Sequence, residues 1–176
     1  QKEDGWSQAT AKFNAMIVTI DGPAGAGKSS VARFLAERLG FRFLDTGAMY
    51  RSVAWLALKE QVSWDDSTRI AQLVDGAELQ LTENQVLLNG QDVTKEIREP
   101  EVGQVIHHVA DNQQVRKQLV QLQRKLVADQ NVVTEGRDQG SVAFPDADCK
   151  IFLTASPAER ARRRSAELEK RGVTIS

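Results

Sequence analysis

Short apolar runs alternate with longer amphipathic segments through the first half of the chain. Residues 16–20, Met-Ile-Val-Thr-Ile, form a continuous apolar run that predicts a strand buried on both faces of a parallel sheet. Apolar side chains then recur at helical spacing, at Val31, Phe34, Leu35 and Leu39. Gly40 is placed to end that helix. We expect a second short strand at 41–44 and two further helices at 49–59 and 65–74.

The period changes to that of β-strands between about residues 77 and 93. A Leu-Gln-Leu segment is followed by Val-Leu-Leu, and Asn89-Gly90 then supplies a dipeptide typical of tight hairpin turns. This pattern predicts a small antiparallel insert. Two helices should follow it, and the second carries one apolar stripe made of Val115, Leu119, Leu122 and Leu126.

Two later apolar runs, at 132–134 and 150–154, predict two more parallel strands. Ser156 and Glu159 follow at capping-box spacing with proline at the first helical position, so a helix should run from about 157 to 172. Strands and helices therefore alternate along the chain. We expect an α/β fold built on a doubly wound parallel sheet, with helices on both faces and right-handed crossovers.

Composition narrows the function classes without identifying one. The 176 residues carry 23 Lys and Arg against 24 Asp and Glu, a formal net charge of −1 that attracts neither nucleic acid nor acidic membranes. The lone Cys149 excludes an internal disulfide, and we expect it to be buried at the start of a strand. No apolar run reaches the roughly 18 residues that span a bilayer. Residues 1–15 are polar and aperiodic, so we expect an N-terminal tail, a cytoplasmic location and no membrane partner.

A glycine-rich loop joins the first predicted strand to the first predicted helix. It matches GxxxxGK[ST] from Gly22 to Ser29, in the context that a phosphate-binding loop requires. Glycine and alanine let backbone N–H groups approach a polyphosphate, and the helix N-terminus adds its positive dipole end. Lys28 would supply a cation for the β- and γ-phosphates, and Ser29 a hydroxyl for Mg²⁺. The residues expected to hold the phosphates are Gly22, Ala24, Gly25, Ala26, Gly27, Lys28, Ser29 and Ser30.

A bound nucleoside triphosphate fits a GTPase switch, a motor ATPase or a small-molecule kinase, so we looked for residues that hold a second substrate. The segment from Asp45 to Arg51 follows the second strand and places Thr46 at a helix N-terminus, a sensible grip for a monoester phosphate. Its plainer interpretation is a helix cap followed by a solvated arginine. Arg137 and Asp138 lie between glycines after the strand at 132–134, and either face a ligand or form a loop ion pair.

A cluster of arginines lies on the helix after Ser156: Arg160, Arg162, Arg163 and Arg164. Positions 160, 163 and 164 share one face, where like charges repel unless an anion meets them. The alternative is a solvated face that nearby glutamates partly neutralise.

Four segments together resemble bacterial-type cytidylate kinase: IDGPAGAGKSSVA, LDTGAMYR, GRDQGSVAFPDAD and KIFLTASPAERARRR. The resemblance runs from about Met16 to Gly172. It implies the P-loop nucleoside monophosphate kinase fold, with residues 16–176 as one domain. In that domain about 65–112 would form a substrate-binding insert in the monophosphate-binding region, and about 157–176 the start of an arginine-bearing lid.

The resemblance also implies a reaction and a set of site residues. ATP, with Mg²⁺ on Ser29, would phosphorylate CMP or dCMP in pyrimidine metabolism, and the catalytic side chains would be Lys28, Arg51, Arg137 and Arg163. Arg160 would lie against the donor phosphates. The residues expected at the acceptor nucleotide are Asp45, Thr46, Tyr50, Arg51, His107, Arg116, Arg137 and Asp138. Asp138 would accept from the exocyclic amino group of cytosine while an arginine donates to the ring.

Some positions depart from the family pattern. Ser29-Ser30 follows the lysine where many relatives have glycine-threonine, and His107 stands where a serine is usual. The family also continues beyond residue 176 through a further lid segment, a strand and a helix; if these 176 residues are all that is present, we expect those elements to be absent.

Other functions fit the sequence less well. A kinase of another small acceptor, such as shikimate or a different nucleoside monophosphate, is the main alternative. A GTPase switch or ATP-binding adaptor would require an Asn-Lys-x-Asp stretch, which reads guanine, and this sequence contains none. A nucleic-acid-binding module would require aromatic residues between its basic ones, so we expect no nucleic-acid partner. We also expect a monomer.

Overall fold

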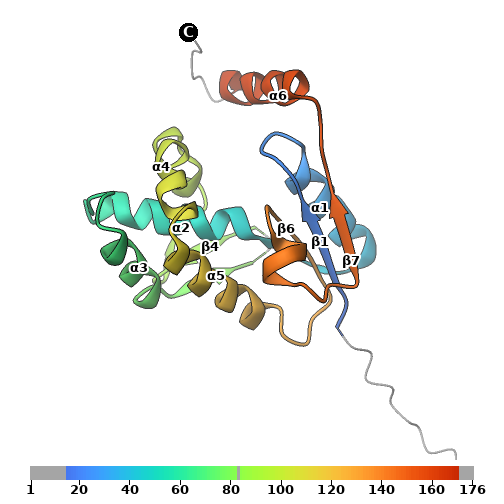
Figure 1. Ribbon diagram of the computed structural model, residues 1–176, viewed down its shortest axis with the longest axis horizontal. Helices are drawn as coiled ribbons and strands as arrows, with labels where there is room; N and C mark the ends of the chain where they lie inside the picture. The colour runs from blue at the N-terminus through green and yellow to red at the C-terminus, as the bar shows by residue number, and fades with distance from the viewer. Residues whose placement is uncertain (1–14, 83, 171–176) are drawn as a thin grey trace, which may run out of the picture.

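A four-stranded parallel sheet forms the centre of the protein (Figure 1). The computed structural model describes residues 15–82 and 84–170. The strands are β1 (Ile17–Asp21), β2 (Arg42–Asp45), β6 (Val132–Gly136) and β7 (Cys149–Phe152), in the order β2-β6-β1-β7. All of their pairings are parallel, as the apolar runs predict.

Both faces of the sheet are covered, because neighbouring β6 residues point to opposite sides. Val133 packs in a small cluster with Val18, Ala32 and Ala36, where helix α1 (Lys28–Leu39) lies on the sheet. Val132 belongs to the larger cluster on the other face, formed mainly by helices α2 to α5. The doubly wound arrangement predicted from the sequence is therefore confirmed.

The larger cluster is built by consecutive helices and a small sheet. The helices are α2 (Thr46–Lys59), α3 (Ser67–Asp75), α4 (Pro100–Ala110) and α5 (Gln113–Leu126). Strands β3 (Leu79–Leu81), β4 (Val86–Leu88) and β5 (Gln91–Asp92) pair antiparallel, and the 3-10 turn η1 (Glu96–Arg98) follows. Asn89 and Gly90 both have positive φ, which confirms the predicted turn.

Two helical segments follow the last two strands of the central sheet. The helical turn η2 (Gln139–Ala143) follows β6, and helix α6 (Pro157–Lys170) follows β7 (Figure 1). The Ser156 hydroxyl accepts the backbone N–H of Glu159 at 3.2 Å, so serine caps this helix as predicted. Residues 171–172 of the predicted helix, and residues 1–14 of the predicted tail, lie outside the described residues. None of the helices in the described part of the chain is long and apolar enough to cross a membrane.

Two details of local structure differ from the sequence patterns. Helix α2 begins at Thr46, as expected for the segment from Asp45 to Arg51 but three residues before the range 49–59, because the Asp45 carboxylate caps it by accepting the N–H of Ala48 at 2.9 Å. Cys149 is exposed rather than buried, since β7 is an edge strand of the sheet. The strand order, which the apolar pattern does not encode, decides that exposure.

Candidate active site

Three segments with chemically active side chains leave the same edge of the central sheet. In the strand register Asp21 of β1 lies beside Gly136 of β6, and Asp45 of β2 lies beside Glu135 of β6. The strands are parallel, so their carboxyl ends meet at one edge, where open α/β sheets bind ligands. The loops after β1 and β6, and helix α2, which begins directly after β2, therefore start side by side.

The loop after β1 has a backbone that only glycine adopts easily. Gly22, Gly25 and Gly27 have φ values of 147°, 76° and 94°, and a Cβ at Gly22 would lie 2.0 Å from the carbonyl oxygen of Leu153. Helix α1 begins directly after Gly27. The free N–H groups of its first turn, which includes Ser29 and the exposed Ser30, therefore face the loop, and the corner that they form with it has the geometry that suits an anion.

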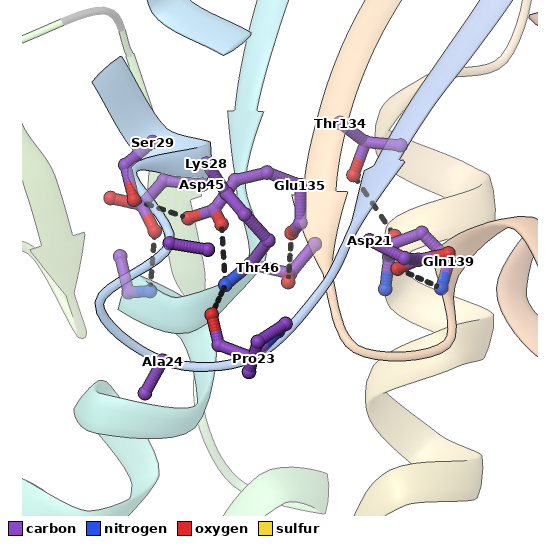
Figure 2. Close-up of polar contacts among 12 residues, drawn as sticks. Asp21, Pro23, Ala24, Lys28, Ser29, Asp45, Thr46, Thr134, Glu135 and Gln139 are labelled. Carbon is purple, nitrogen blue, oxygen red and sulfur yellow. Dashed lines mark hydrogen bonds and ion pairs between the residues drawn. The ribbon is translucent and has the colours of Figure 1, made fainter. Parts of the chain in front are cut away.

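A buried carboxylate from β6 faces this corner. Glu135 is 6% exposed, its Oε1 accepts the Ser29 hydroxyl at 2.8 Å, and its Oε2 lies 3.9 Å from Lys28 Nζ (Figure 2). The Lys28 ammonium also donates to the Pro23 carbonyl at 3.2 Å. The charged groups of the corner thus hold one another in place through contacts within the chain.

Burial shifts the acid–base behaviour of both charged groups. Burial raises the pKa of Glu135 above its usual range, and the nearby Asp45 charge adds to this, while Ser29, Lys28 and Arg137 oppose it. Burial also lowers the pKa of Lys28; Glu135 opposes that change, and Arg137 reinforces it. Arg137 itself is exposed, so its guanidinium reaches the same corner from the solvent side.

A second group of side chains surrounds the residue after Arg137. The carboxylate of Asp138 forms an ion pair with the guanidinium of Arg116 from α5, whose Nη1 also donates to the Ala110 carbonyl at 3.4 Å. The charges of Asp138 and Arg116 also act on the hydroxyl of Tyr50 on α2. Burial raises the pKa of Tyr50, the negative charge of Asp138 raises it further, and the positive charge of Arg116 lowers it. Three segments far apart in sequence thus bring these predicted site residues together.

The arginines of α6 contact the backbone of the glycine-rich loop. Arg160 Nη1 donates to the Ala24 carbonyl at 3.4 Å, and Arg163 Nη1 donates to the Ala26 carbonyl at 2.9 Å. The half-buried Glu159 accepts from Arg162 Nε at 2.8 Å and from Arg163 Nε at 2.7 Å, and these bonds lower its pKa to about 2. Two of the predicted arginines therefore lie at the loop, whereas Arg162 is turned to Glu159.

Comparison with known proteins decides the family. The sequence model of the family described as cytidylate kinase matches residues 18–176. The chain belongs to the cytidylate kinase family.

Individual relatives agree with this assignment. A protein named cytidylate kinase from Rhodopirellula baltica is 50% identical over 161 residues, 92% of this chain and 70% of that protein. One of the same name from Carboxydothermus hydrogenoformans is 48% identical over 92% of this chain and 74% of its own length. A bifunctional pantoate ligase/cytidylate kinase from Synechococcus sp. (strain CC9605) is 51% identical over 90% of this chain and 34% of its own.

Among the residues that the cytidylate kinase resemblance singled out, some make contacts within the fold. Besides capping α2, Asp45 pairs through Oδ2 with Arg98 Nη2 at 3.3 Å. The buried Thr46 hydroxyl donates to the Glu135 carbonyl at 2.6 Å. Arg51 Nη1 donates to the Ile97 carbonyl at 3.4 Å. These bonds hold α2 and the turn η1 against the edge of the sheet.

His107 is placed differently from the other predicted acceptor residues. It is exposed on α4, and its ring centroid lies 4.0 Å from that of His108. His108 in turn stacks on Trp64 at 5.1 Å. Among the described residues the structure thus brings His107 into an aromatic cluster and not into the Arg116–Asp138 pair.

Sequence reasoning missed two residues of this edge, Glu135 and Asp21. Each is an acidic residue at the carboxyl end of an apolar run. Asp21 directly precedes the glycine-rich loop, and Glu135 precedes the segment that carries Arg137 and Asp138. An acid that ends a buried strand beside a phosphate-binding loop is the signal that could have found them. The structure places both next to the loops that they precede (Figure 2).

A cavity of about 300 Å³ lies beside this edge, between α1, β2 and the small sheet. Asp45 and Arg98 line it together with Arg33, Phe43, Thr82 and Asn84. The residues that line it include neither Lys28 nor Asp138, so it is separate from the two groups described above.

Proposed function

We propose that this protein transfers the γ-phosphoryl group of ATP to CMP or dCMP, giving ADP and CDP or dCDP. One observation carries the proposal: the Lys28–Glu135 corner and the Arg116–Asp138 pair open at the same sheet edge, joined by the adjacent Arg137. Family membership gives the reaction, and this arrangement supplies a place for each nucleotide.

The donor site in this proposal is the glycine-rich loop. The backbone N–H groups of the loop and of the first turn of α1 would hold the β- and γ-phosphates, with Lys28 as their cation. Arg160 and Arg163, which now donate to loop carbonyls, lie close enough to turn toward the phosphates. Residues 157–170 would then serve as the beginning of the lid.

The donor set also fits a magnesium ion. Mg²⁺ prefers oxygen ligands and is commonly held by one or two protein groups together with substrate phosphates. Ser29 offers a hydroxyl and Glu135 a buried carboxylate 2.8 Å away. Bound there, the ion would neutralise charge on the transferring phosphoryl group.

The acceptor site would be the cleft side of α2, α4 and α5, with residues 65–112 as the substrate-binding insert. Asp138 would accept a hydrogen bond from the cytosine amino group while Arg116 donates to the ring nitrogen or carbonyl. Uracil presents an oxygen where cytosine presents that amino group, and would leave the carboxylate unpaired. Arg51 and Arg137 would hold the monophosphate, with Thr46 and Tyr50 beside it.

The reaction needs little acid–base chemistry from the chain. The acceptor phosphate oxygen is already an anion, so catalysis consists mainly of alignment and charge neutralisation. Arg137 lies where it would offset repulsion between the two phosphate chains, since it already influences both Lys28 and Glu135. All of these side chains come from one chain, and we propose a cytoplasmic monomer.

A coupled assay of ADP release tests the proposal directly. With ATP and Mg²⁺ we expect turnover with CMP and dCMP, and a kcat/KM for UMP and AMP lower by at least about 10- to 100-fold, because a buried polar group left unpaired costs about 1–3 kcal/mol. Shikimate should give only the background rate. Faster turnover with AMP, UMP or shikimate than with CMP would overturn the proposal.

A further inference from the structure

Asp21, the last residue of β1, binds the backbone of another loop with both carboxylate oxygens. Its Oδ1 accepts the N–H of Gln139 at 2.8 Å, and its Oδ2 accepts the N–H of Gly140 at 2.8 Å (Figure 2). These two N–H groups directly follow Asp138. One side chain, that of Asp21, therefore joins the start of the glycine-rich loop to the loop that carries Asp138. Asp21 and Asp138 are 117 positions apart in the sequence.

The same loop is anchored on its other side by buried amides. The Thr134 hydroxyl donates to Gln139 Oε1 at 2.9 Å, and Gln139 Nε2 donates to Gln123 Oε1 at 3.3 Å. Gln139 is 2% exposed, and Thr134 and Gln123 are fully buried. Gln123 lies on α5, the helix that also carries Arg116.

Close packing leaves this loop little freedom. A Cβ at Gly140 would lie 2.7 Å from the Thr19 hydroxyl, and a Cβ at Gly136 would lie 2.7 Å from the Gln139 side chain. The backbone between the two glycines is thus held against β1 and against its own side chain. The position of Asp138 follows from these contacts as well as from Arg116.

We propose that Asp21 is a positioning residue for base recognition: it fixes the backbone after Asp138, so that this carboxylate meets the acceptor base in one geometry. The inference rests on the proposed reading of cytosine by Asp138. A recognition group must be held to within about 0.5 Å to discriminate, and the second set of contacts behind it decides whether it is. Charge-assisted bonds to two successive N–H groups provide such a hold.

Two substitutions separate position from charge. Asp21→Asn keeps the shape of the side chain but turns an amide N–H₂ toward one of the two N–H donors. Asp21→Glu keeps the negative charge but moves the carboxylate outward by about one C–C bond, roughly 1.5 Å. A role of charge alone, acting on the nearby Lys28, would be preserved in Asp21→Glu; a positioning role would be lost in both variants.

Asp148→Asn is the matched control. Asp148 Oδ2 accepts the N–H of Ile17 at 2.8 Å, the same kind of bond at the opposite end of β1. It is remote from the loop edge, so it reports what loss of one such bond does to the fold. Asp138→Ala is the reference for loss of base reading.

The readout is the ratio of kcat/KM for CMP to that for UMP, measured with the KM for ATP. We expect Asp21→Asn and Asp21→Glu to lower the ratio at least about five-fold, with the KM for ATP within about three-fold of wild type and Asp148→Asn unchanged. Thr134→Val, which loosens Gln139 from the other side and leaves Asp21 intact, should lower the ratio by a smaller factor. This variant keeps the proposal testable if either Asp21 variant fails to fold.

Two results would count against the inference in different ways. A wild-type ratio in the Asp21 variants and in Thr134→Val, together with a collapsed ratio in Asp138→Ala, would overturn the role of Asp21 alone. An unchanged ratio in Asp138→Ala would overturn the proposed reading of cytosine, and the inference with it.

Discussion

Oε2 of Glu135 lies 3.9 Å from the ammonium nitrogen of Lys28, and the other oxygen of the same carboxylate accepts the hydroxyl of Ser29 at 2.8 Å. Two consecutive residues of the glycine-rich loop are thus held by one buried side chain of the neighbouring strand β6. This contact sets the electrostatics of the glycine-rich loop, because burial disfavours the charge of both partners.

Relative to wild type, Glu135→Gln should gain stability as the pH rises from 4 to 8. The folded-state pKa of Glu135 is raised above its usual value near 4.5, mainly by burial. Such a carboxyl favours folding below its unfolded pKa, and this contribution is lost as the pH rises through the folded pKa. The advantage of Glu135→Gln should therefore be small below pH 4.5 and grow above it. Urea unfolding of both proteins at pH 4 and pH 8 measures this.

The same substitution should lower activity. Gln retains an acceptor for the Ser29 hydroxyl but removes the negative charge beside Lys28, and we expect kcat to fall about ten-fold or more. Glu78→Gln, on an exposed acid of the small-sheet region, is the control and should change neither property. A Glu135→Gln variant that gains no stability relative to wild type between pH 4 and pH 8, and that is fully active, would contradict both expectations.

Lys28→Ala should abolish most of the phosphoryl transfer. Loss of the cation that holds the β- and γ-phosphates removes charge stabilisation from the transferring group, and we expect kcat to fall about 100-fold or more. Lys59→Ala is the control, since Lys59 on α2 is exposed and donates to Gln91 at 3.0 Å. The ADP-release assay and circular dichroism together separate lost chemistry from lost fold. Near-normal kcat in Lys28→Ala would remove Lys28 from the mechanism.

Much of the proposed donor site could be predicted from the sequence, because a glycine-rich loop of this kind is local. Its glycines, its lysine and the start of the helix that follows all lie between Gly22 and Ser29, and the strand and helix signals on either side agree with them. Helix α1 and strand β1 accordingly form where the apolar pattern predicts them.

The partners of that loop could not be predicted in the same way, because they depend on strand order. Glu135 faces Lys28 only because β6 lies between β1 and β2, an arrangement that no local pattern specifies. The exposure of Cys149 has the same origin, since β7 lies at the edge. The aromatic cluster at His107 has a related origin, since it depends on the packing of α4, which stacks His108 on Trp64.

Thr46→Val should destabilise the protein by about 1–2 kcal/mol, because the buried Glu135 carbonyl loses its donor and Val supplies none. The bond joins α2 to β6, so the substitution should also raise the KM for CMP. Ser52→Ala is the matched control: it removes a buried hydroxyl bond of 2.9 Å within α2 itself. Thermal unfolding and acceptor kinetics measure the two effects. If both variants lose equal stability and the KM for CMP is unchanged in Thr46→Val, Thr46 has only a structural role and the expected effect on acceptor binding is wrong.

Glu159→Gln should strengthen ATP binding. Glu159 now pairs with Arg162 and Arg163, and its removal would leave more positive charge beside the loop. We expect the dissociation constant for ATP to fall about two- to three-fold at low salt, with a smaller effect at high salt. The pKa of Glu159 is about 2, so the difference should not change between pH 5 and pH 8. Glu169→Gln on the same helix is the control, and weaker binding in Glu159→Gln would contradict the assignment.

The proposed mechanism requires that ATP and CMP bind end to end at one edge of the sheet, with the phosphates of both nucleotides between Lys28 and Arg137. Calorimetric titration with an adenosine–cytidine bisubstrate, in which five phosphates link the two 5′ positions, tests this arrangement. A molecule that fills both sites should bind at least about 100-fold more tightly than ATP or CMP alone, because the second contact becomes intramolecular. An affinity no higher than that of ATP would contradict the shared site.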